Sequence, residues 1–394
     1  MPMDFNRINV AGWESDPNVA IDIAKEIERV SWEESPFEPL TGRGEDRGIK
    51  VFETHNTAPC RPRLRPKLQG AGVEGNADFE TNLDNFEILT QTMYPKVVGN
   101  AIKSEIAFYQ NMKNVDFAKE AAEGLKTWIR EKRDRNIITA LSNDFTNVVV
   151  CDSTKSFKDT SSCKSVQQAT RKIVKGDVLN VNAIRQAIFM ARTGTKYNQN
   201  KAFPIKPIRT QIKRDEQIVA RVYNYVFLVD SYGASQLRKD PEWIELQKMD
   251  KRGELNNLFT GFLGVIDGCP VIEIGVWTDV SIGLLNSEVS DNAYLQNINK
   301  ANCANQNITP PSYYTDNQPL CIGALIGASA IVLAGNPEPK FYIGKDDLER
   351  KTICGIDRVL SIAKGRFVSD IDSPLSIYDN TDYATIGLFY SKES

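Results

Sequence analysis

Residues 47–98 constrain the fold of this chain most, because this long segment holds few residues that could build a core. Its first half places prolines at 59, 62 and 66 between basic residues, and each proline fixes φ and disfavours helix at the residue before it. A glycine-rich stretch, LQGAGVEGN, follows, and then a polar–apolar alternation from Phe79 to Thr90. The pattern predicts two long strands joined by a glycine-rich tip. Such a hairpin projects from its domain and packs on something else. We call residues 47–98 the projecting hairpin.

Gly70, Gly72 and Gly75 in this segment spell GxGxxG, which is also the pattern of a dinucleotide-binding loop. In that kind of site the glycines follow a buried strand and open a helix. Here they follow a basic, proline-rich stretch and precede an alternating strand. We therefore interpret them as the tip of the hairpin and expect no nucleotide cofactor.

The net charge of −3 conceals charges that are sorted along the chain. Residues 1–46 carry eleven acidic and four basic side chains, whereas residues 155–214 carry fourteen basic and two acidic ones. The acidic segment is too short and too charged to bury a core of its own, so we expect an arm that contains one amphipathic helix. The apolar positions of that helix are Val19, Ile23, Ile27 and Val30.

The strongest helical pattern lies between Pro95 and Pro204, a span without proline. Apolar residues recur there every three or four positions and form one stripe. We predict a helix from about Glu105 to Leu141, roughly 50 Å long, that acts as a strut for a sheet or a bundle. The stripe consists of Phe108, Met112, Val115, Ala118, Ala122, Leu125 and Ile129.

The remaining segments predict shorter elements of both kinds, so the fold class is α+β. Asp177 and Asn180 are available as helix caps, and Asp267-Gly268 is a tight turn between two strands. The expected elements are helices over 165–174 and 181–192, a strand over 222–230, a short helix with Ser231 as its N-cap, a hairpin over 258–274, a long loop over 279–318, a helix over the small-residue run 320–334, and strands from 339 onward.

Residues able to do chemistry are scarce. The chain has a single histidine, His55, and seven scattered cysteines without a CxxC pair, which indicates reduced thiols and argues against metal sites. We name no catalytic, cofactor-binding or metal-binding residue and expect no enzyme. The first residues do not form a signal peptide, and the longest apolar run, 322–335, is too short to span a bilayer. We therefore expect synthesis and folding in a cytoplasm, with no membrane contact.

Several stretches, in their order along the chain, resemble the major capsid proteins of the N-four-like podophages. The resemblance is strongest over residues 222–368 and runs from about 47 to 390. It departs from the family at Asp230, where the family has a histidine. The stretches are LQGAGVEGN, YNYVFLVDSYGASQLRKDPEWIE, LFTGFLGVIDGCPVIEI, LCIGALIGASAIVLAG, GIDRVLSIAKGRFVSD and YATIGLFY.

The resemblance implies the tailed-phage major capsid fold, with an N-terminal arm, an extended E-loop hairpin, a peripheral P-domain with a long spine helix, and an axial A-domain. It implies a structural subunit that self-assembles into the pentamers and hexamers of an icosahedral phage head around double-stranded DNA. The corresponding residues are 1–46 for the arm, 47–98 for the E-loop, 99–219 for the P-domain with spine helix 105–141, 220–336 for the A-domain, and 337–394 for strands that return to the P-domain.

An extended arm and hairpin cannot be stable alone, so we expect an obligate oligomer in which the hairpin contacts an adjacent subunit. The acidic arm is a possible counterpart for the basic hairpin residues, and such pairs fix register and orientation. The candidate contact residues are Arg61, Arg63, Arg65, Lys67, Gly70, Gly72 and Gly75. Further expected partners are a portal, possibly scaffolding or decoration proteins, and packaged DNA bound without sequence specificity. The expected location is the virion.

Two other functions stay open at this point. An encapsulin-like compartment shell would share the fold. A cytosolic nucleic-acid-binding protein would use the basic region 155–214 and the run Arg130–Arg135 to contact phosphates. No RNA-binding aromatic signature or helix-turn-helix pattern accompanies these residues. The alternative to nucleic-acid binding is a structural role, in which the run Arg130–Arg135 forms a solvated helix face and an interface to the acidic arm.

Overall fold

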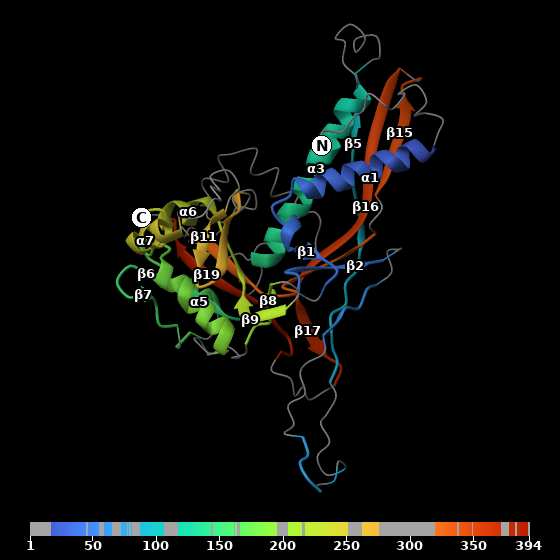
Figure 1. Ribbon diagram of the computed structural model, residues 1–394. Helices are drawn as coiled ribbons and strands as arrows, with labels where there is room; N and C mark the ends of the chain where they lie inside the picture. The colour runs from blue at the N-terminus through green and yellow to red at the C-terminus, as the bar shows by residue number, and fades with distance from the viewer. Residues whose placement is uncertain are drawn as a thin grey trace.

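The computed structural model is an elongated molecule with three parts (Figure 1). A rounded body lies to one side, a tall layer of strands and helices rises beside it, and the described residues of the projecting hairpin lie at the end opposite to this layer. The structure describes residues 17–44, 46–54, 59–64, 72–76, 78, 80, 87–105, 117–142, 145–160, 162–163, 166–194, 204–214, 217–250, 262–275, 320–336, 339–348, 350–371, 378–382 and 384–392.

The tall layer is a six-stranded sheet covered by helices on one face. Its strands are β1 (Thr41–Gly42), β2 (Ile49–Glu53), β14 (Ile331–Gly335), β16 (Lys351–Lys364) and β15 (Lys340–Asp346) in this order, and β5 (Lys96–Lys103) also pairs with β16. Helices α1 (Pro17–Glu33) and α3 (Phe117–Ser142) pack on this sheet through a separate small core. That core contains Ile23 and Ile27 of α1, as the sequence spacing predicts, together with Leu125, Phe341 and Ile356.

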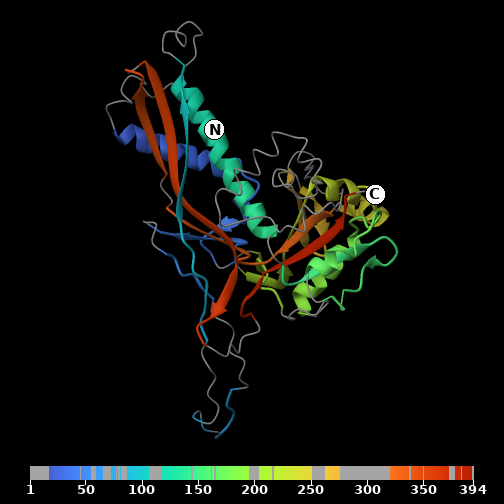
Figure 2. The same ribbon diagram turned by 180° about the vertical axis from the view of Figure 1, so that it is seen from behind.

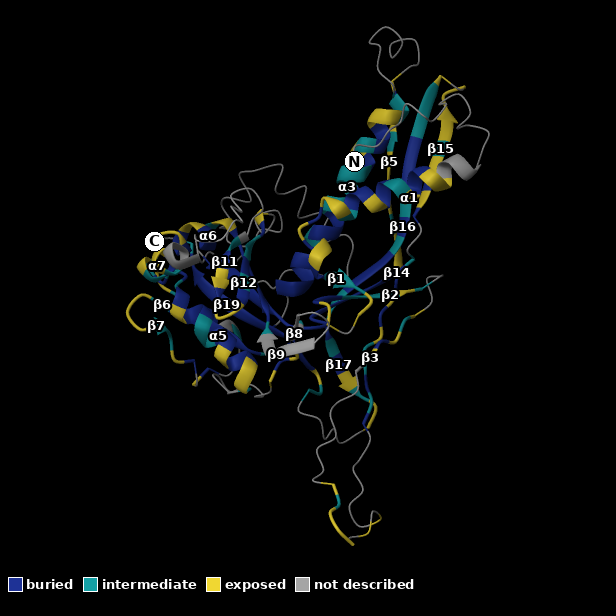
Figure 3. Ribbon diagram, in the orientation of Figure 1, coloured by how far each residue is buried: buried dark blue, intermediate teal, exposed yellow. Residues whose placement is uncertain are grey.

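The rounded body is built on a seven-stranded sheet. Its strands are, in order, β11 (Phe262–Ile266), β12 (Cys269–Glu273), β10 (Val226–Val229), β13 (Leu320–Ile326), β19 (Thr385–Ser391), β6 (Val148–Asp152) and β7 (Ser156–Phe157). Around it lie α4 (Val166–Thr170), α5 (Val181–Thr193), α6 (Ser231–Leu237) and α7 (Pro241–Asp250). α5 packs on β6 and β19, and α6 packs on β10 and β13. The central strands are buried along their whole length (Figure 3).

The stem of the projecting hairpin joins a small third sheet of β18 (Thr381–Asp382), β17 (Arg366–Ser369), β4 (Leu89–Thr90) and β3 (Arg63–Leu64). A two-stranded ribbon, β8 (Arg209–Arg214) and β9 (Gln217–Asn224), lies beside the body, and a short 3-10 helix, η3 (Glu38–Leu40), follows α1. The chain crosses between the two large sheets more than once. β6 and β19 lie in the seven-stranded sheet, whereas β14 lies in the six-stranded one, and β19 therefore does not return with β15 and β16 to the tall layer.

The predicted helix over 320–334 is wrong. These residues form β13 and β14, with a turn between them. Every residue of both strands is buried, because neighbouring strands flank them and side chains cover both faces. A short apolar run buried on all sides has no periodicity that separates strand from helix, which explains the error.

Smaller differences concern where helices begin. The N-cap of α6 is Asp230 rather than Ser231, because the Asp230 carboxylate accepts the backbone N–H of Gly233 at 2.7 Å. Asn180 caps α5 as expected, whereas Asp177 accepts the N–H groups of Ser153 and Val174 and caps no helix.

Helix bounds also differ from expectation. The helix expected over 165–174 spans only Val166–Thr170. The spine helix is described from Phe117, and residue 105 is not helical, while 106–116 and the expected loop over 279–318 lie outside the described residues. The expected strand over 222–230 is interrupted at Tyr225, between β9 and β10.

Candidate functional site

The described part of the projecting hairpin presents two arginines to solvent. Arg61 and Arg63 are exposed on either side of the buried Pro62. They are two residues apart in extended backbone, so both side chains leave the strand on the same side. Within the described residues neither guanidinium makes an ion pair or a hydrogen bond, which leaves both charges available to another molecule.

Hydrogen bonds within the hairpin and one to β16 hold its stem in place. Cys60 and Met93 exchange two backbone hydrogen bonds of 2.9 and 2.8 Å, and the Gln91 N–H donates to the Pro62 carbonyl at 3.1 Å. The Gln91 side-chain amide also donates to the Lys364 carbonyl at 2.7 Å. Hydrogen bonds therefore fix the strand that carries Arg61 and Arg63.

At the tip, Gly72 and Gly75 have φ of +74° and +68°, the left-handed region that glycine adopts without strain. Both are exposed, as a turn requires. This agrees with the interpretation of these glycines as a hairpin tip. Arg65, Lys67, Gly70 and His55 lie outside the described residues.

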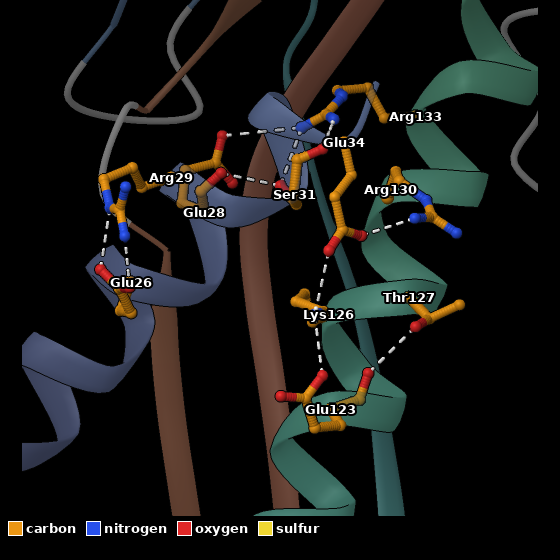
Figure 4. A network of polar contacts seen from close by, with 10 residues as sticks. All are labelled: Glu26, Glu28, Arg29, Ser31, Glu34, Glu123, Lys126, Thr127, Arg130 and Arg133. Carbon is orange, nitrogen blue, oxygen red and sulfur yellow. Dashed lines mark hydrogen bonds and ion pairs between the residues drawn. The ribbon is translucent and has the colours of Figure 1, made fainter. Parts of the chain in front are cut away.

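The acidic arm finds basic partners within its own chain (Figure 4). Glu34, just after α1, pairs with Lys126 at 3.2 Å and with Arg130 at 2.6 Å, both on α3. On α1 itself, Arg29 pairs with Glu26 and Glu33 at 2.5 Å each. The expected interface between the arm and the run Arg130–Arg135 therefore exists, and it is intramolecular.

A buried polar cluster lies where α1 crosses α3. Arg133 stacks on the Trp32 ring at 3.5 Å from the centroid and donates to the carbonyl and hydroxyl oxygens of Ser31 at 2.7 and 3.1 Å. Glu28 accepts the Trp32 indole N–H at 2.7 Å and forms an ion pair with Arg358 of β16. The sequence predicts a solvated face for this part of α3, yet only 1% of Arg133 is exposed.

Burial sets the electrostatics of this cluster. It lowers the pKa of Arg133 to about 10, against the attraction of Asp134 and Glu28, so the guanidinium stays charged at neutral pH. Burial also raises the pKa of Asp134, against the favourable effects of Arg133 and the Ser35 hydroxyl, which donates at 2.8 Å. The cluster ties the arm to the spine helix.

Within the basic region, the described side chains mostly hold the body together. Lys158 pairs with the buried Asp177, and Arg185 pairs with Glu242. Arg192 donates to the Asp267 carbonyl at 2.8 Å. These contacts leave fewer positive charges for nucleic acid than the sequence count suggests.

The described residues show no arrangement typical of an active site. They contain no group of three metal-ligating side chains, and their helices include none that is long and apolar enough to cross a membrane. The six described cysteines form no disulfide with one another, and desolvation raises the pKa of Cys60, which disfavours a reactive thiolate.

Comparisons with known proteins add independent information. No family model matches the chain. The chain is 40% identical over 405 residues to the "Major structural protein ORF14" of Helicobacter pylori bacteriophage KHP30, covering 99% of both chains. The solved head structure of H. pylori bacteriophage KHP40 matches with a TM-score of 0.72 at 41% identity, covering 98% of this chain and 100% of that one. The capsid of Ralstonia phage GP4 shares the fold alone, with a TM-score of 0.61 at 13% identity over 90% of each chain.

Proposed function

The chain belongs to the major capsid proteins of bacteriophages, and on this basis we propose that its copies form the pentamers and hexamers of an icosahedral head around double-stranded DNA. The fold is that of tailed-phage capsid proteins, and the location is the virion capsid. Identity of 40% over nearly the whole chain to a phage major structural protein supports the role in the shell. The narrower resemblance to the N-four-like podophages stays a prediction.

We propose that the parts of the molecule correspond to those of the capsid fold as follows. The six-stranded sheet with α3 is the P-domain and its spine, the seven-stranded sheet is the A-domain, and the projecting hairpin is the E-loop. The domain bounds differ from residues 220–336 in two ways. The sheet of the A-domain includes β6 and β19, which lie outside this range, and β14, which lies inside it, belongs to the sheet of the P-domain.

The observation that carries the proposed contact is the pair of exposed arginines on a supported, projecting hairpin. A copy of the chain that self-associates must bury this hairpin on a neighbour, because the hairpin has almost no core of its own. Arg61 and Arg63, and with them Arg65, Lys67, Gly70, Gly72 and Gly75, are the proposed contact residues. Ion pairs at such a contact set the orientation and the rate of docking.

Reversing one of these charges tests the proposal. Arg63→Glu should reduce the yield of assembled particles at least tenfold while the subunit keeps its secondary structure by circular dichroism, because the Arg63 side chain is exposed and makes no ion pair or hydrogen bond with any described residue. Arg171→Glu, a charge reversal at an exposed site on the rounded body, is the matched control. Electron microscopy and size-exclusion chromatography count the particles. A normal yield from Arg63→Glu would refute the contact.

We also propose that the protein has no catalytic activity and that its further partners are a portal, a scaffolding or decoration protein, and packaged DNA held without sequence specificity. The structural role of a relative that is 40% identical over nearly the whole chain supports this proposal. Nuclease protection of DNA in purified particles would test the packaging role.

A further inference from the structure

A carboxyl group is buried in the rounded body at the point where α6 begins. Asp230 directly follows β10 and is 1% exposed, and it lies between the first turn of α6 and the strands β13 and β19. Figure 1 and Figure 2, which view the molecule from opposite sides, both show the end of β19 beside α6. The shell function makes no use of this carboxyl, so its burial has another reason.

The oxygen atoms around Asp230 require one proton more than Tyr390 can supply. The Tyr390 oxygen lies 2.5 Å from Asp230 Oδ1 and 3.2 Å from the Ile322 carbonyl oxygen. Each of these two contacts between oxygen atoms needs a proton to be a hydrogen bond. The tyrosine hydroxyl has a single proton and the carbonyl has none. The second proton therefore belongs to the Asp230 carboxyl.

The other contacts of Asp230 also favour the neutral form. Oδ1 accepts the Gly233 N–H at 2.7 Å, whereas Oδ2 is buried and receives no hydrogen bond. A buried carboxylate without a cation and without donors on both oxygens is costly. Burial accordingly raises the pKa of Asp230 above its ordinary value of 3.8, against the opposing effects of Tyr390, Gly233 and Cys321.

No cation among the described residues forms an ion pair with Asp230. The titratable side chains that face it are Tyr390 of β19 and Cys321 of β13. The charged side chains of the surrounding elements interact elsewhere: Lys392 lies over the Tyr232 ring, Arg238 pairs with Glu273, and Lys158 pairs with Asp177. Loss of the proton therefore leaves an unpaired negative charge in the interior.

The first turn of α6 covers this position. A Cβ at Gly233 would come within 2.4 Å of the Tyr390 hydroxyl oxygen, so the helix backbone lies directly on Tyr390. Farther along α6, the Gln236 side chain accepts the Leu179 N–H at 2.8 Å and donates to the Ser391 carbonyl at 2.7 Å. The first turn is thus the part of α6 whose docking depends on Asp230.

We propose that Asp230 is a proton-operated latch in the rounded body, closed in acid and loosened toward alkaline pH. With its proton, Asp230 holds the first turn of α6 over Tyr390 and Cys321. Without the proton, the turn opens and water reaches the carboxylate. In the open state the carboxyl has its ordinary pKa of 3.8, so opening releases the proton and becomes more favourable as the pH rises above that value. The inference concerns the subunit itself and does not depend on the shell function.

Labelling of the Cys321 thiol, which is fully buried beside Asp230, reports the opening. The full-length subunit is treated with dithiodipyridine, which reacts with thiols in acid as well as at neutral pH, and modified Cys321 is quantified by mass spectrometry of its peptide. Dividing this rate by the rate for urea-unfolded subunit at the same pH removes the intrinsic reactivity of the thiol. The normalised rate should rise at least tenfold between pH 5 and pH 8, because each pH unit favours opening about tenfold until the raised pKa is reached. An unchanged rate would overturn the latch.

Two comparisons separate the latch from other causes of exposure. Asp230→Asn keeps a helix cap but cannot ionise, so its normalised rate should stay within threefold over the same pH range. A rise as large as that of wild type would overturn the role of Asp230. Cys354, buried in the small core of the tall layer, is a control within the wild-type protein, valid even if Asp230→Asn does not fold. A parallel rise at Cys354 would mean that the whole subunit opens and would overturn a local latch.

Discussion

Replacing Arg133 with methionine should loosen the acidic arm from the spine helix. Methionine keeps most of the volume of the side chain and removes its charge. The substitution deletes two hydrogen bonds to Ser31 and the stacking on Trp32, and it leaves Glu28 and Asp134 with less positive charge nearby.

The size of the effect follows from opposing contributions. Two hydrogen bonds from a charged donor contribute about 2 kcal/mol each, and a desolvated cation over an indole contributes about 2 kcal/mol. Against this, burial lowers the pKa of Arg133 from 12.5 to about 10. At about 1.4 kcal/mol per pKa unit, removing the charge relieves about 3 kcal/mol. The net loss is about 3 kcal/mol, in agreement with the cost of removing one partner from a buried ion pair.

Hydrogen exchange of the full-length subunit, read by mass spectrometry on peptides from α1, measures this loss directly. If α1 opens locally, a loss of about 3 kcal/mol speeds its exchange roughly 100-fold. Arg29→Met is the control, because Arg29 sits on the exposed side of the same helix and its ion pairs contribute little there. Exchange in α1 within threefold of wild type for Arg133→Met would refute the reasoning and would mean that desolvation cancels the contacts.

Three further substitutions test other features. Burial raises the pKa of the Asp230 carboxyl above its ordinary value of 3.8, so its contribution to stability is greatest below that pH and is lost as the pH rises. Asp230→Asn keeps the helix cap and should therefore be more stable than wild type in urea at pH 7 but not at pH 4; equal differences at both pH values would contradict this. Gly335→Ala should cost about 1–3 kcal/mol, because its Cβ would lie 2.2 Å from the Val359 carbonyl, and an unchanged melting temperature would exclude that clash. Leu348 has φ of +54° and is 95% exposed, so Leu348→Asn should raise the free energy of unfolding by about 1 kcal/mol; a lower value in urea titration would argue against strain at this turn.

Local patterns in the sequence correctly predict elements that have one apolar and one polar face, and also caps and tight turns. The stripe of α1, the Asn180 cap of α5 and the Asp267-Gly268 turn are visible in the sequence because each depends on neighbours a few residues away. The run 320–334 was misread because the same apolar surroundings cover both of its faces, and only pairing with distant strands shows that it is extended.

Some features of the candidate site can likewise be predicted from the sequence, whereas others depend on contacts between distant residues. The hairpin and its arginines follow from composition, since a basic, proline-rich segment offers few apolar residues for a core. The hydrogen bond that anchors the hairpin stem joins Gln91 to Lys364, which are far apart along the chain, and so no sequence window contains it. The buried position of Arg133 is likewise set by α1, which lies about a hundred residues before it.

The packing of α1 against β15 and β16 also determines when a newly made subunit is ready to assemble. Ile27 packs in the same core as Phe341 and Ile356, about 300 residues later, so the ribosome must make nearly the whole chain before this core can close. Those same late strands, β15 and β16, also complete the six-stranded sheet. An unfinished chain therefore has its hairpin but neither the finished sheet nor an α1 that is anchored on it. We expect a subunit to become ready for assembly only when its synthesis is complete.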